Sequence, residues 1–277
     1  MHFVVCLKQV PDTSEVRIDP KTNTLMREGV PSIINPYDAH ALEEALALRD
    51  KVGGKVTVLS MGPPQAVESL RKAVSLGADE AILLSDRAFA GSDTLATSYI
   101  LAQALEKIRE EQGIDVVLCG KQAIDGDTAQ VGPGIARRLN IPQLTYVIKV
   151  DWIKEGEIQV NRKLEDGREV AQATLPVLLT VEKELNEIRY ASFPNMLRAA
   201  KYEPLVWGAD KFHLSPAEMG LKGSPTSVSR IFAPPGRTGG EQIMAIDDPG
   251  SAAISLVEKL FQQNIIMVHP MARGGRD

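Results

Sequence analysis

Residues 116–134 read Val-Val-Leu-Cys-Gly-Lys-Gln-Ala-Ile-Asp-Gly-Asp-Thr-Ala-Gln-Val-Gly-Pro-Gly. The apolar run Val116–Cys119 predicts a buried strand that ends at Gly120. The polar loop Gln122–Asp127 follows, and Thr128 opens a segment whose apolar residues have helical spacing. A strand, a polar loop with glycines and a helix start form an anion site, because helix N–H groups and the helix dipole favour a phosphate there. The segment therefore predicts nucleotide binding.

Similar units of strand and helix precede this segment. Short runs rich in β-branched and aliphatic residues predict strands at Phe3–Leu7, Lys55–Leu59 and Ala81–Leu84. The helices expected between them are Asp38–Val52 with Asp38 as its cap, Pro64–Leu76, and Asp93–Gln112. This alternation predicts the α/β class: a doubly wound, mostly parallel, Rossmann-like sheet that binds its ligand at the carboxyl ends of its strands.

The pattern changes after Pro142. Alternating segments predict antiparallel strands at Tyr146–Ile153, Ile158–Lys163 and Val170–Ala173, an insertion of hairpin strands within 146–175. A further strand at Val177–Val181 is a candidate for addition to the main sheet. We therefore assign residues 1–185 to one nucleotide-binding domain that includes the hairpin.

Strand and helix signals become sparse from Asn186 onward. Prolines and small polar residues interrupt this stretch, and such a composition buries little apolar surface by itself. A final amphipathic helix is expected at Pro249–Gln263. We assign residues 186–277 to a docking loop and a C-terminal arm with a helix, which contact a partner subunit.

The composition excludes several classes of protein. The 277 residues carry a formal net charge of −5, and no stripe of Lys and Arg is present, which argues against nucleic-acid binding. Apolar stretches fall short of the ~18 residues of a membrane span, and Met1–Val5 lacks the layout of a signal peptide. The two cysteines, Cys6 and Cys119, lie in apolar runs and are expected to be buried thiols. A cytoplasmic protein is expected.

The loops that follow the predicted strands converge at one edge of the sheet and supply the candidate cofactor-binding residues. Taken singly, an Asn-Pro-Tyr-Asp turn or an Asp before a helix is more often a local cap than a ligand. The acidic side chains are also possible magnesium ligands, but bonds to backbone N–H groups or ribose hydroxyls are the more frequent role. The candidates are Cys6, Lys8, Gln9, Val10, Asn35, Pro36, Tyr37, Asp38, Met61, Gly62, Asp93, Thr94, Gly120, Gln122, Asp125, Gly126, Asp127, Thr128, Ala129, Gln130, Val131, Gly132 and Pro133.

Motifs for side-chain catalysis are missing from the sequence. No G-x-G-x-x-G follows a strand, and no G-x-x-x-x-G-K-[ST] phosphate loop occurs. The four histidines lack metal-ligand spacing, and no Ser or Cys occupies a G-x-S-x-G turn. We therefore assign no catalytic residue and no metal, and expect a bound cofactor to supply the chemistry.

Six segments in order resemble the small (beta) subunit of electron-transferring flavoproteins. They are Val-Val-Cys-Leu-Lys-Gln-Val-Pro-Asp at 4–12, Asn-Pro-Tyr-Asp at 35–38, Ser-Met-Gly-Pro-Pro at 60–64, Leu-Gly-Ala-Asp-Glu-Ala at 76–81, Gly-Lys-Gln-Ala-Ile-Asp at 120–125 and Arg-Tyr-Ala-Ser-Phe-Pro-Asn at 189–195. The resemblance covers nearly the whole chain. It implies a heterodimer with a larger alpha subunit that carries a redox-active FAD, while the small subunit holds a second adenine nucleotide.

The family resemblance leaves two ligands open. In simple one-electron carriers the second nucleotide is a structural AMP, whereas in electron-bifurcating members it is an FAD that takes a hydride from NADH. The AMP-type loop resembles Asp-Asp-Asp-x-Asn-Gln-Thr-Gly, but here Gly126 and Ala129 replace an acidic residue and the Asn. Thr13 also stands where AMP-type members often carry an aromatic residue. We therefore expect FAD, with AMP as the alternative, and electron bifurcation from NADH.

A second resemblance concerns partner docking. Carrier members have Ala-Thr-Leu-Pro-Asn where this chain has Ala191–Asn195, so that a phenylalanine replaces the leucine. An exposed apolar side chain on a loop is suited to anchor a partner, here an acyl-CoA or other dehydrogenase. The alternative is that this phenylalanine packs internally. The expected docking residues are Phe193, Pro194, Asn195 and Met196.

Overall fold

The computed structural model describes residues 1–12, 17–18, 25–26, 32–229, 240, 243 and 248–266. The chain divides into two compact units, Met1–Ile231 and Phe232–Asp277. The second unit contains the expected final helix, α6 (Pro249–Gln262), and Asp248 caps it by accepting hydrogen bonds from the N–H groups of Gly250 and Ser251. Thr13 lies outside the described residues.

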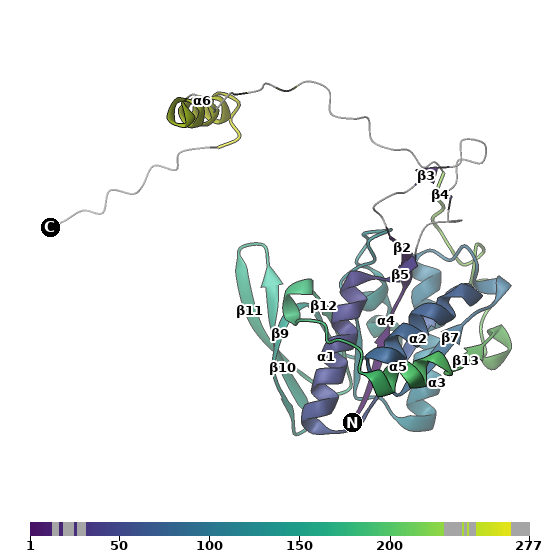
Figure 1. The fold of residues 1–277 in the computed structure, drawn as a ribbon. Coiled ribbons are helices and arrows are strands. Elements are labelled where there is room, and N and C mark those ends of the chain that lie inside the picture. Colours follow the sequence, from purple (N-terminus) through teal and green to yellow (C-terminus); the bar gives the residue numbers. More distant parts are fainter. Residues whose placement is uncertain are drawn as a thin grey trace. The chain divides into compact units, whose positions relative to one another are not determined.

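The first unit is built on one sheet (Figure 1). In the described part of the chain, this sheet has nine strands in the order β11-β10-β9-β12-β8-β1-β6-β7-β13. The strand β10 pairs antiparallel with both of its neighbours, and the remaining pairs are parallel. The expected α/β class, with its mostly parallel sheet and hairpin insertion, is thereby confirmed. The bounds are β1 His2–Cys6, β6 Lys55–Met61, β7 Glu80–Leu84, β8 Val116–Gly120, β9 Gln143–Lys154, β10 Glu157–Leu164, β11 Gly167–Thr174, β12 Val177–Val181 and β13 Leu205–Trp207.

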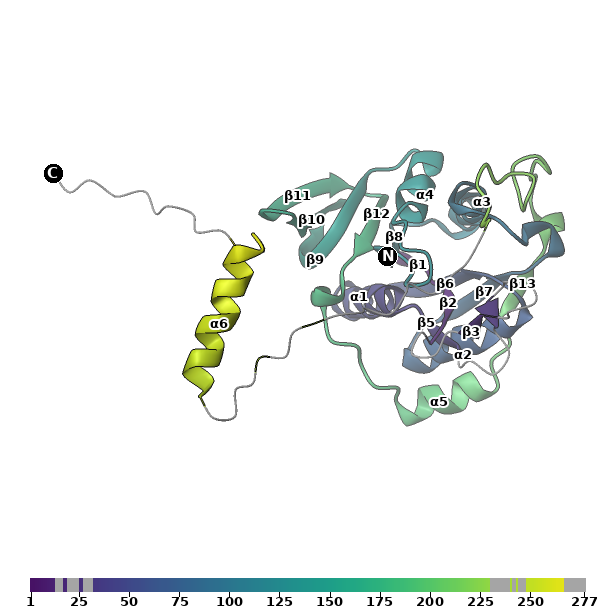
Figure 2. The ribbon, with the colours of Figure 1, turned by 90° about the horizontal axis from the view of Figure 1, so that it is seen from above.

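Helices cover both faces of the parallel strands (Figure 2). One face carries α1 (Pro36–Val52) and α2 (Val67–Leu76), and the other carries α3 (Thr94–Gln112) and α4 (Val131–Leu139). Successive side chains of β1 point to opposite faces, so that Phe3 and Val5 join the α1–α2 core while Val4 and Cys6 join the α3–α4 core. Both cysteines are buried thiols, as expected.

Two helix starts differ from the expected ones, and each difference has a local cause. Helix α1 begins at Pro36, because proline suits the first helical position, so Asp38 lies inside the first turn and is not the cap. Helix α4 begins at Val131 and not at Thr128, because Asp127 (φ 51°) and Ala129 (φ 53°) have left-handed backbone conformations that no α-helix contains. The cap that was expected at Asp93 is confirmed: its Oδ1 accepts from the N–H groups of Leu95 and Ala96.

Short elements complete the first unit. The loop after β1 forms β2 (Gln9–Pro11), which pairs with β5 (Ser32–Ile34) just before α1, and β3 (Arg17–Ile18) pairs with β4 (Leu25–Met26). The proline at 64 starts a 3-10 turn and α2 follows it at Val67. The 3-10 turns are Pro64–Ala66, Arg87–Phe89, Lys183–Leu185 and Ala209–Lys211.

The stretch that follows Asn186 contains more structure than the sequence predicts. Helix α5 (Phe193–Ala200) packs against α2 and buries Ala199. The strand β13 then adds in parallel to β7 at the edge of the sheet. Both elements are short, eight and three residues, which leaves too few positions for a hydrophobic period to stand out. This stretch therefore packs on the α/β unit itself.

In the described part of the chain, no helix is both long enough and apolar enough to span a bilayer.

Candidate functional site

The loop after β8 is tied to the start of α1 by one buried asparagine. The Asn35 side chain donates from Nδ2 to the carbonyl oxygen of Gln122 (2.8 Å) and accepts at Oδ1 from the N–H of Ile124 (3.2 Å). The backbone N–H of Asn35 donates to the carbonyl oxygen of Lys8 (2.9 Å). The predicted candidates Lys8, Asn35 and Gln122 therefore meet at the carboxyl edge of the sheet, although more than a hundred residues separate the first from the last.

Asp38 links the loop after β1, the first turn of α1 and the end of β8. Its carboxylate accepts from the N–H of Lys8 (2.8 Å) and from the N–H of Gly120 (2.8 Å), and only 6% of the residue is exposed. Burial raises the pKa of Asp38 to about 6, and the two backbone hydrogen bonds oppose that rise. Because both oxygens are occupied, Asp38 fixes the ends of β1 and β8 and is not free to grip a ligand directly.

Gly120 shows how closely these elements approach. A Cβ at this position would lie 2.4 Å from Tyr37 Cβ, 2.6 Å from Asp38 Oδ1 and 2.8 Å from the backbone nitrogen of Asp38. Glycine is therefore required where β8 passes the first turn of α1. Cys6 is buried at the end of β1, and Pro36 and Tyr37 are half-buried in the first turn of α1.

An ion pair closes the loop over the end of β1. Lys8 Nζ lies 2.7 Å from both carboxylate oxygens of Asp125. The Lys8 side chain is 50% exposed, so the pair adds about 0–1 kcal/mol to stability and exchanges readily for another anion. Beyond it, Gln122 Nε2 donates to Asp127 Oδ1 (2.6 Å), and residues 125–128 are exposed. The acidic side chains of the loop thus have polar partners within the protein.

The loop ends at the N-terminus of α4. The N–H groups of Val131 and Gly132 lie in the first turn, where N–H groups have no acceptor within the helix and attract anions. Pro133 follows, and its ring nitrogen has no hydrogen to satisfy. Thr94, at the start of α3, donates from Oγ1 to Gln130 Oε1 (2.8 Å) and so brings a second helix N-terminus to the loop.

Some predicted candidates have other contacts. Desolvation raises the pKa of Asp93, but hydrogen bonds from Ala96, Thr226 and Leu95 outweigh it, so the pKa is lowered overall. The carboxylate of Asp93 is occupied by these groups. Val10 is buried in the core. Gln9 reaches the carbonyl oxygen of Gln65 (3.4 Å), which lies beyond Met61 and Gly62 in the loop after β6. The N–H of Gly62 donates to the carbonyl oxygen of Leu84 (3.0 Å) at the end of β7.

The 121–133 loop has a second face, which the sequence did not reveal. It borders a cavity of about 340 Å³, a size at the lower end for small-molecule sites. The residues that line it come from the loop, the first turn of α4 and three strands: Lys121, Ala129, Pro133, Gln143, Thr145, Tyr146, Arg162 and Thr180. Sequence signals for Tyr146 and Arg162 were absent, because the closeness of β9 and β10 to this loop follows from β12 lying between β8 and β9.

Lys121 lies beside two tyrosine rings, of which Tyr146 lines the cavity. Lys121 Nζ lies 5.7 Å from the ring centre of Tyr37 and 5.3 Å from that of Tyr146, and it pairs with Glu182 at 3.1 Å. Burial lowers the pKa of Lys121, but the hydrogen bond and the charge of Glu182 outweigh burial and raise it overall, so the ammonium stays charged. Arg162 is held by Thr145, through its carbonyl oxygen and its Oγ1, both at 2.8 Å.

Backbone strain marks both walls of the cavity. Tyr146 has φ 57° at a register shift between β9 and β12, and Ala129 has φ 53° on the opposite wall. Left-handed conformations are costly for residues other than glycine and asparagine, and they cluster at ligand sites. The cavity is therefore a candidate part of the site.

The expected docking residues lie on α5. Phe193 is 67% exposed and Met196 is 46% exposed, so the alternative of an internally packed phenylalanine is excluded for the protein as described. Pro194 occupies the first turn, and Asn195 lies against Gly77 at the end of α2. Phe193, Met196 and Leu197 of α5 and Tyr190 before it are exposed apolar side chains, and we call them together the α5 surface.

Comparison with known proteins decides the family. The electron transfer flavoprotein domain family matches residues 22–211 of the chain. The electron transfer flavoprotein subunit beta of Thermoanaerobacterium thermosaccharolyticum is 53% identical over 267 residues, which are 96% of this chain and 100% of that protein. The chain belongs to the electron transfer flavoprotein beta-subunit family.

Other relatives of the family widen the range of assemblies. Protein FixA of Azotobacter vinelandii is 52% identical over 270 residues, 95% of this chain and 96% of that protein. Subunit CarD of the caffeyl-CoA reductase–Etf complex of Acetobacterium woodii is 51% identical over 267 residues, 96% of this chain and 100% of that protein. The resemblance expected from the six segments is confirmed. Among the described residues, no three His, Cys, Asp or Glu side chains are grouped as metal ligands.

Proposed function

We propose that this beta subunit binds FAD at the 120–133 loop and serves flavin-based electron bifurcation together with an alpha subunit. The observation that carries the proposal is the two-faced loop. One face meets Asn35 and Lys8 at the sheet edge, and the other borders the cavity beside Ala129. A dinucleotide has two ends to place, and the loop offers a wall to each of them.

The residues on the first face suit the adenosine and pyrophosphate. Tyr37 and the backbone around Asn35 would flank the adenosine part. The N–H groups of Val131 and Gly132, with the Thr128 hydroxyl, would hold the phosphates, and Lys8 would exchange Asp125 for a phosphate oxygen. Gly126 leaves room for this approach, since among the described residues no atom lies within 4 Å of where its Cβ would be.

The second face suits a flat ring with acceptor atoms at its edge. Lys121, Arg162 and the threonine hydroxyls are donors, and the ring of Tyr146 offers a stacking surface. On the loop side of the cavity, Ala129 and Pro133 have small side chains that leave room for a ring. These residues fit the isoalloxazine end of FAD better than they fit AMP, which would leave the cavity unused.

When bound, FAD would supply the redox chemistry between NADH, the FAD of the alpha subunit and a dehydrogenase. The chain itself contributes binding, orientation and a surface for its partners. The name of the relative CarD places that protein in a complex with a CoA-ester reductase, and we propose an acyl-CoA or other dehydrogenase as the partner here. A cytoplasmic setting agrees with the two buried thiols.

The nucleotide content of the purified heterodimer tests the proposal. The complex of this chain with its alpha subunit is denatured, and the released FAD and AMP are separated by chromatography and counted. Two FAD and no AMP per heterodimer are expected. One FAD and one AMP would overturn the proposal and assign to this subunit the structural AMP of a simple electron carrier.

Replacing Ala129 separates the strain of the loop from the volume of the cavity. Both Ala129→Asn and Ala129→Gly relieve the left-handed backbone, so each should raise the free energy of unfolding by about 1 kcal/mol. Only asparagine also fills the cavity, so Ala129→Asn should weaken FAD binding roughly tenfold, about 1.4 kcal/mol, and admit AMP. Thermal melts and nucleotide counts measure the two effects. Equal FAD retention in both variants would show that the ring lies elsewhere.

Docking at the α5 surface predicts a kinetic effect of Phe193→Ala. Truncating an exposed aromatic anchor commonly costs more than 1 kcal/mol of binding, so the KM for a purified acyl-CoA dehydrogenase should rise roughly tenfold while nucleotide content stays constant. The control is Val170→Ala, an equally exposed apolar residue on β11. An unchanged KM in Phe193→Ala would remove the α5 surface as the docking site.

A further inference from the structure

The segment that leads into α5 is fastened along one face of α1. Asn186 donates from Nδ2 to the carbonyl oxygen of His40 (3.1 Å) and to Glu44 Oε2 (3.0 Å), and its Oδ1 lies 2.9 Å from His40 Nδ1. Glu44 is buried, and desolvation raises its pKa, while the hydrogen bond from Asn186 opposes that rise. The segment thus covers a polar face of α1 and supplies hydrogen bonds to the groups that it buries.

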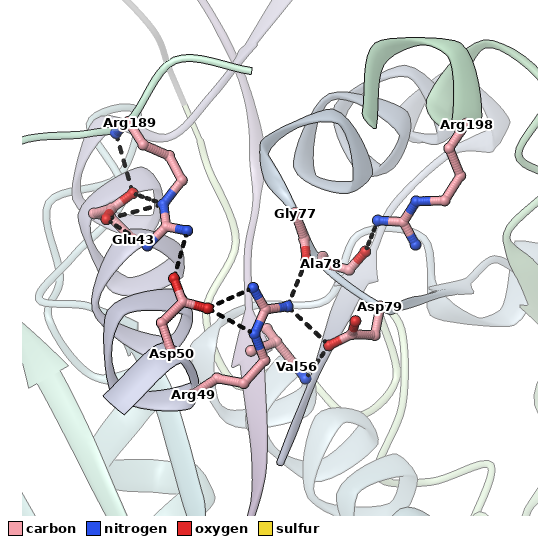
Figure 3. A network of polar contacts seen from close by, with 9 residues as sticks. All are labelled: Glu43, Arg49, Asp50, Val56, Gly77, Ala78, Asp79, Arg189 and Arg198. Carbon is pink, nitrogen blue, oxygen red and sulfur yellow. Dashed lines mark hydrogen bonds and ion pairs between the residues drawn. The ribbon is translucent and has the colours of Figure 1, made fainter. Parts of the chain in front are cut away.

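One arginine makes the strongest part of this attachment (Figure 3). Arg189 donates from Nε and Nη2 to the carboxylate of Glu43 at 2.9–3.1 Å, and its backbone N–H also donates to Glu43 Oε2 (3.1 Å). Its Nη1 donates to Asp50 Oδ2 at 2.9 Å. Glu43 is 7% exposed, so the guanidinium of Arg189 forms an ion pair with a buried carboxylate.

The network continues to the far end of α5. Asp50 accepts from Arg49, whose Nη1 reaches the carbonyl oxygen of Gly77 (2.7 Å) in the turn between α2 and β7. Arg198, in the last turn of α5, donates to the carbonyl oxygen of Ala78 (2.7 Å) in that same turn. The α5 surface therefore lies between two arginine anchors, Arg189 before it and Arg198 behind it.

Helix α1 connects these anchors to the nucleotide loops. Its first turn carries Asp38, which binds the N–H groups of Lys8 and Gly120, and Asn35 just before it holds the 122–124 loop. Farther along, the same helix carries Glu43 and Asp50. One rigid element thus sets the position of the docking segment relative to the nucleotide.

We propose that Arg189 is a positioning residue for partner docking: it holds the N-terminal end of α5 at a fixed place relative to the nucleotide loops. The inference rests on the proposed docking role of the α5 surface. Arginine is needed because its planar fork serves Glu43 and Asp50 together, which a lysine ammonium cannot do with the same geometry. Removing the fork should free the segment while the loops around Asn35 and Gly120 keep their own bonds.

Hydrogen exchange tests the clamp without any partner protein. In the heterodimer, Arg189→Ala should speed the exchange of amides 190–200 at least roughly tenfold, with amides 120–134 and the nucleotide content unchanged. Arg189→Lys, which keeps the positive charge, and Asp50→Asn, which leaves the bonds between Arg189 and Glu43, should give intermediate increases. Arg168→Ala, at an exposed arginine on β11, is the control. Unchanged protection of 190–200 in Arg189→Ala and Arg189→Lys would overturn the inference.

Kinetics with a purified acyl-CoA dehydrogenase separates this inference from the proposed function. Arg189→Ala and Phe193→Ala should both raise the KM for the dehydrogenase with kcat unchanged, and Arg189→Lys should recover part of the loss. A raised KM in Phe193→Ala alone would leave docking in place and overturn the positioning role. An unchanged KM in both variants, with faster exchange in Arg189→Ala, would overturn docking at this surface and with it the role assigned to the clamp.

Discussion

Replacing Gly120 with alanine should lower the free energy of unfolding by about 3 kcal/mol and empty the proposed nucleotide site. The new Cβ would lie 2.4 Å from Tyr37 Cβ and 2.8 Å from the backbone nitrogen of Asp38, so relief requires α1 to move away from β8. That movement also lengthens the 2.8 Å hydrogen bond from the Gly120 N–H to Asp38. Helix backbone cannot rotate aside as a flexible side chain can. We therefore expect Gly120→Ala to be more destabilising than the same substitution at Gly126 or Gly132.

Two other glycines of the same loop provide the comparison. A Cβ at Gly126 meets open space among the described residues, and the φ of Gly126 is outside the left-handed region. The free energy of unfolding of Gly126→Ala should therefore stay within about 0.5 kcal/mol of the native value. Gly132→Ala would meet Thr180 Cγ2 at 2.6 Å and Cys119 Sγ at 2.9 Å, which are side-chain atoms, and should fall between the other two. Denaturant unfolding and nucleotide counts give the order. A Gly120→Ala protein as stable as Gly126→Ala would contradict the packing described here.

The second large effect concerns the pH dependence of stability at Asp38. Burial raises the pKa of this carboxyl from 3.8 to about 6 in the folded protein. Between these values the folded protein keeps the proton that the unfolded chain has lost, so the contribution of Asp38 to stability falls as pH rises from about 4 to about 6. The shift corresponds to about 3 kcal/mol, fully expressed above the folded pKa.

Asp38→Asn removes this titration while keeping the shape of the side chain. The amide still accepts one backbone N–H bond and loses the other, a constant cost of about 1–3 kcal/mol. The difference in unfolding free energy between variant and native protein should therefore move by about 3 kcal/mol in favour of the variant between pH 4 and pH 7. Asp166→Asn, in the exposed turn between β10 and β11, is the control. A pH-independent difference for Asp38→Asn would show that Asp38 ionises as it does in the unfolded chain.

The alternating units of the first half could be predicted because each strand and helix carries its own local pattern. The strands near Val4, Val58 and Val117 are short apolar runs, and Asp93 and Gly113 mark both ends of α3. Convergence of the loops at one sheet edge then follows from parallel topology alone. The predicted meeting of Lys8, Asn35 and the 120–125 loop rests on that general rule, and the hydrogen bonds of Asn35 bear it out.

Contacts between distant segments could not be predicted in the same way. Asp38 follows Asn-Pro-Tyr, a sequence that matches a cap, and only the approach of residues 8 and 120 gives its carboxylate another role. Helix α4 starts later than predicted, at Val131, because Ala129, although a good helix former, is held in a left-handed conformation. Arg162 and Tyr146 lack any local mark of a site, since their place beside Lys121 depends on strand order.

The position of β12 has a consequence for the order of folding. This strand lies between β8 and β9 in the sheet, although the entire β9–β11 hairpin precedes it in the chain. On the ribosome, the 120–133 loop emerges long before Thr180, which forms the opposite wall of its cavity. Pairings between strands so distant in sequence form late, because the intervening chain must be ordered first. With the function proposed here, nucleotide capture waits for β12, which ends at Val181, and a nascent chain that stops before β12 should release the nucleotide rather than fold around it.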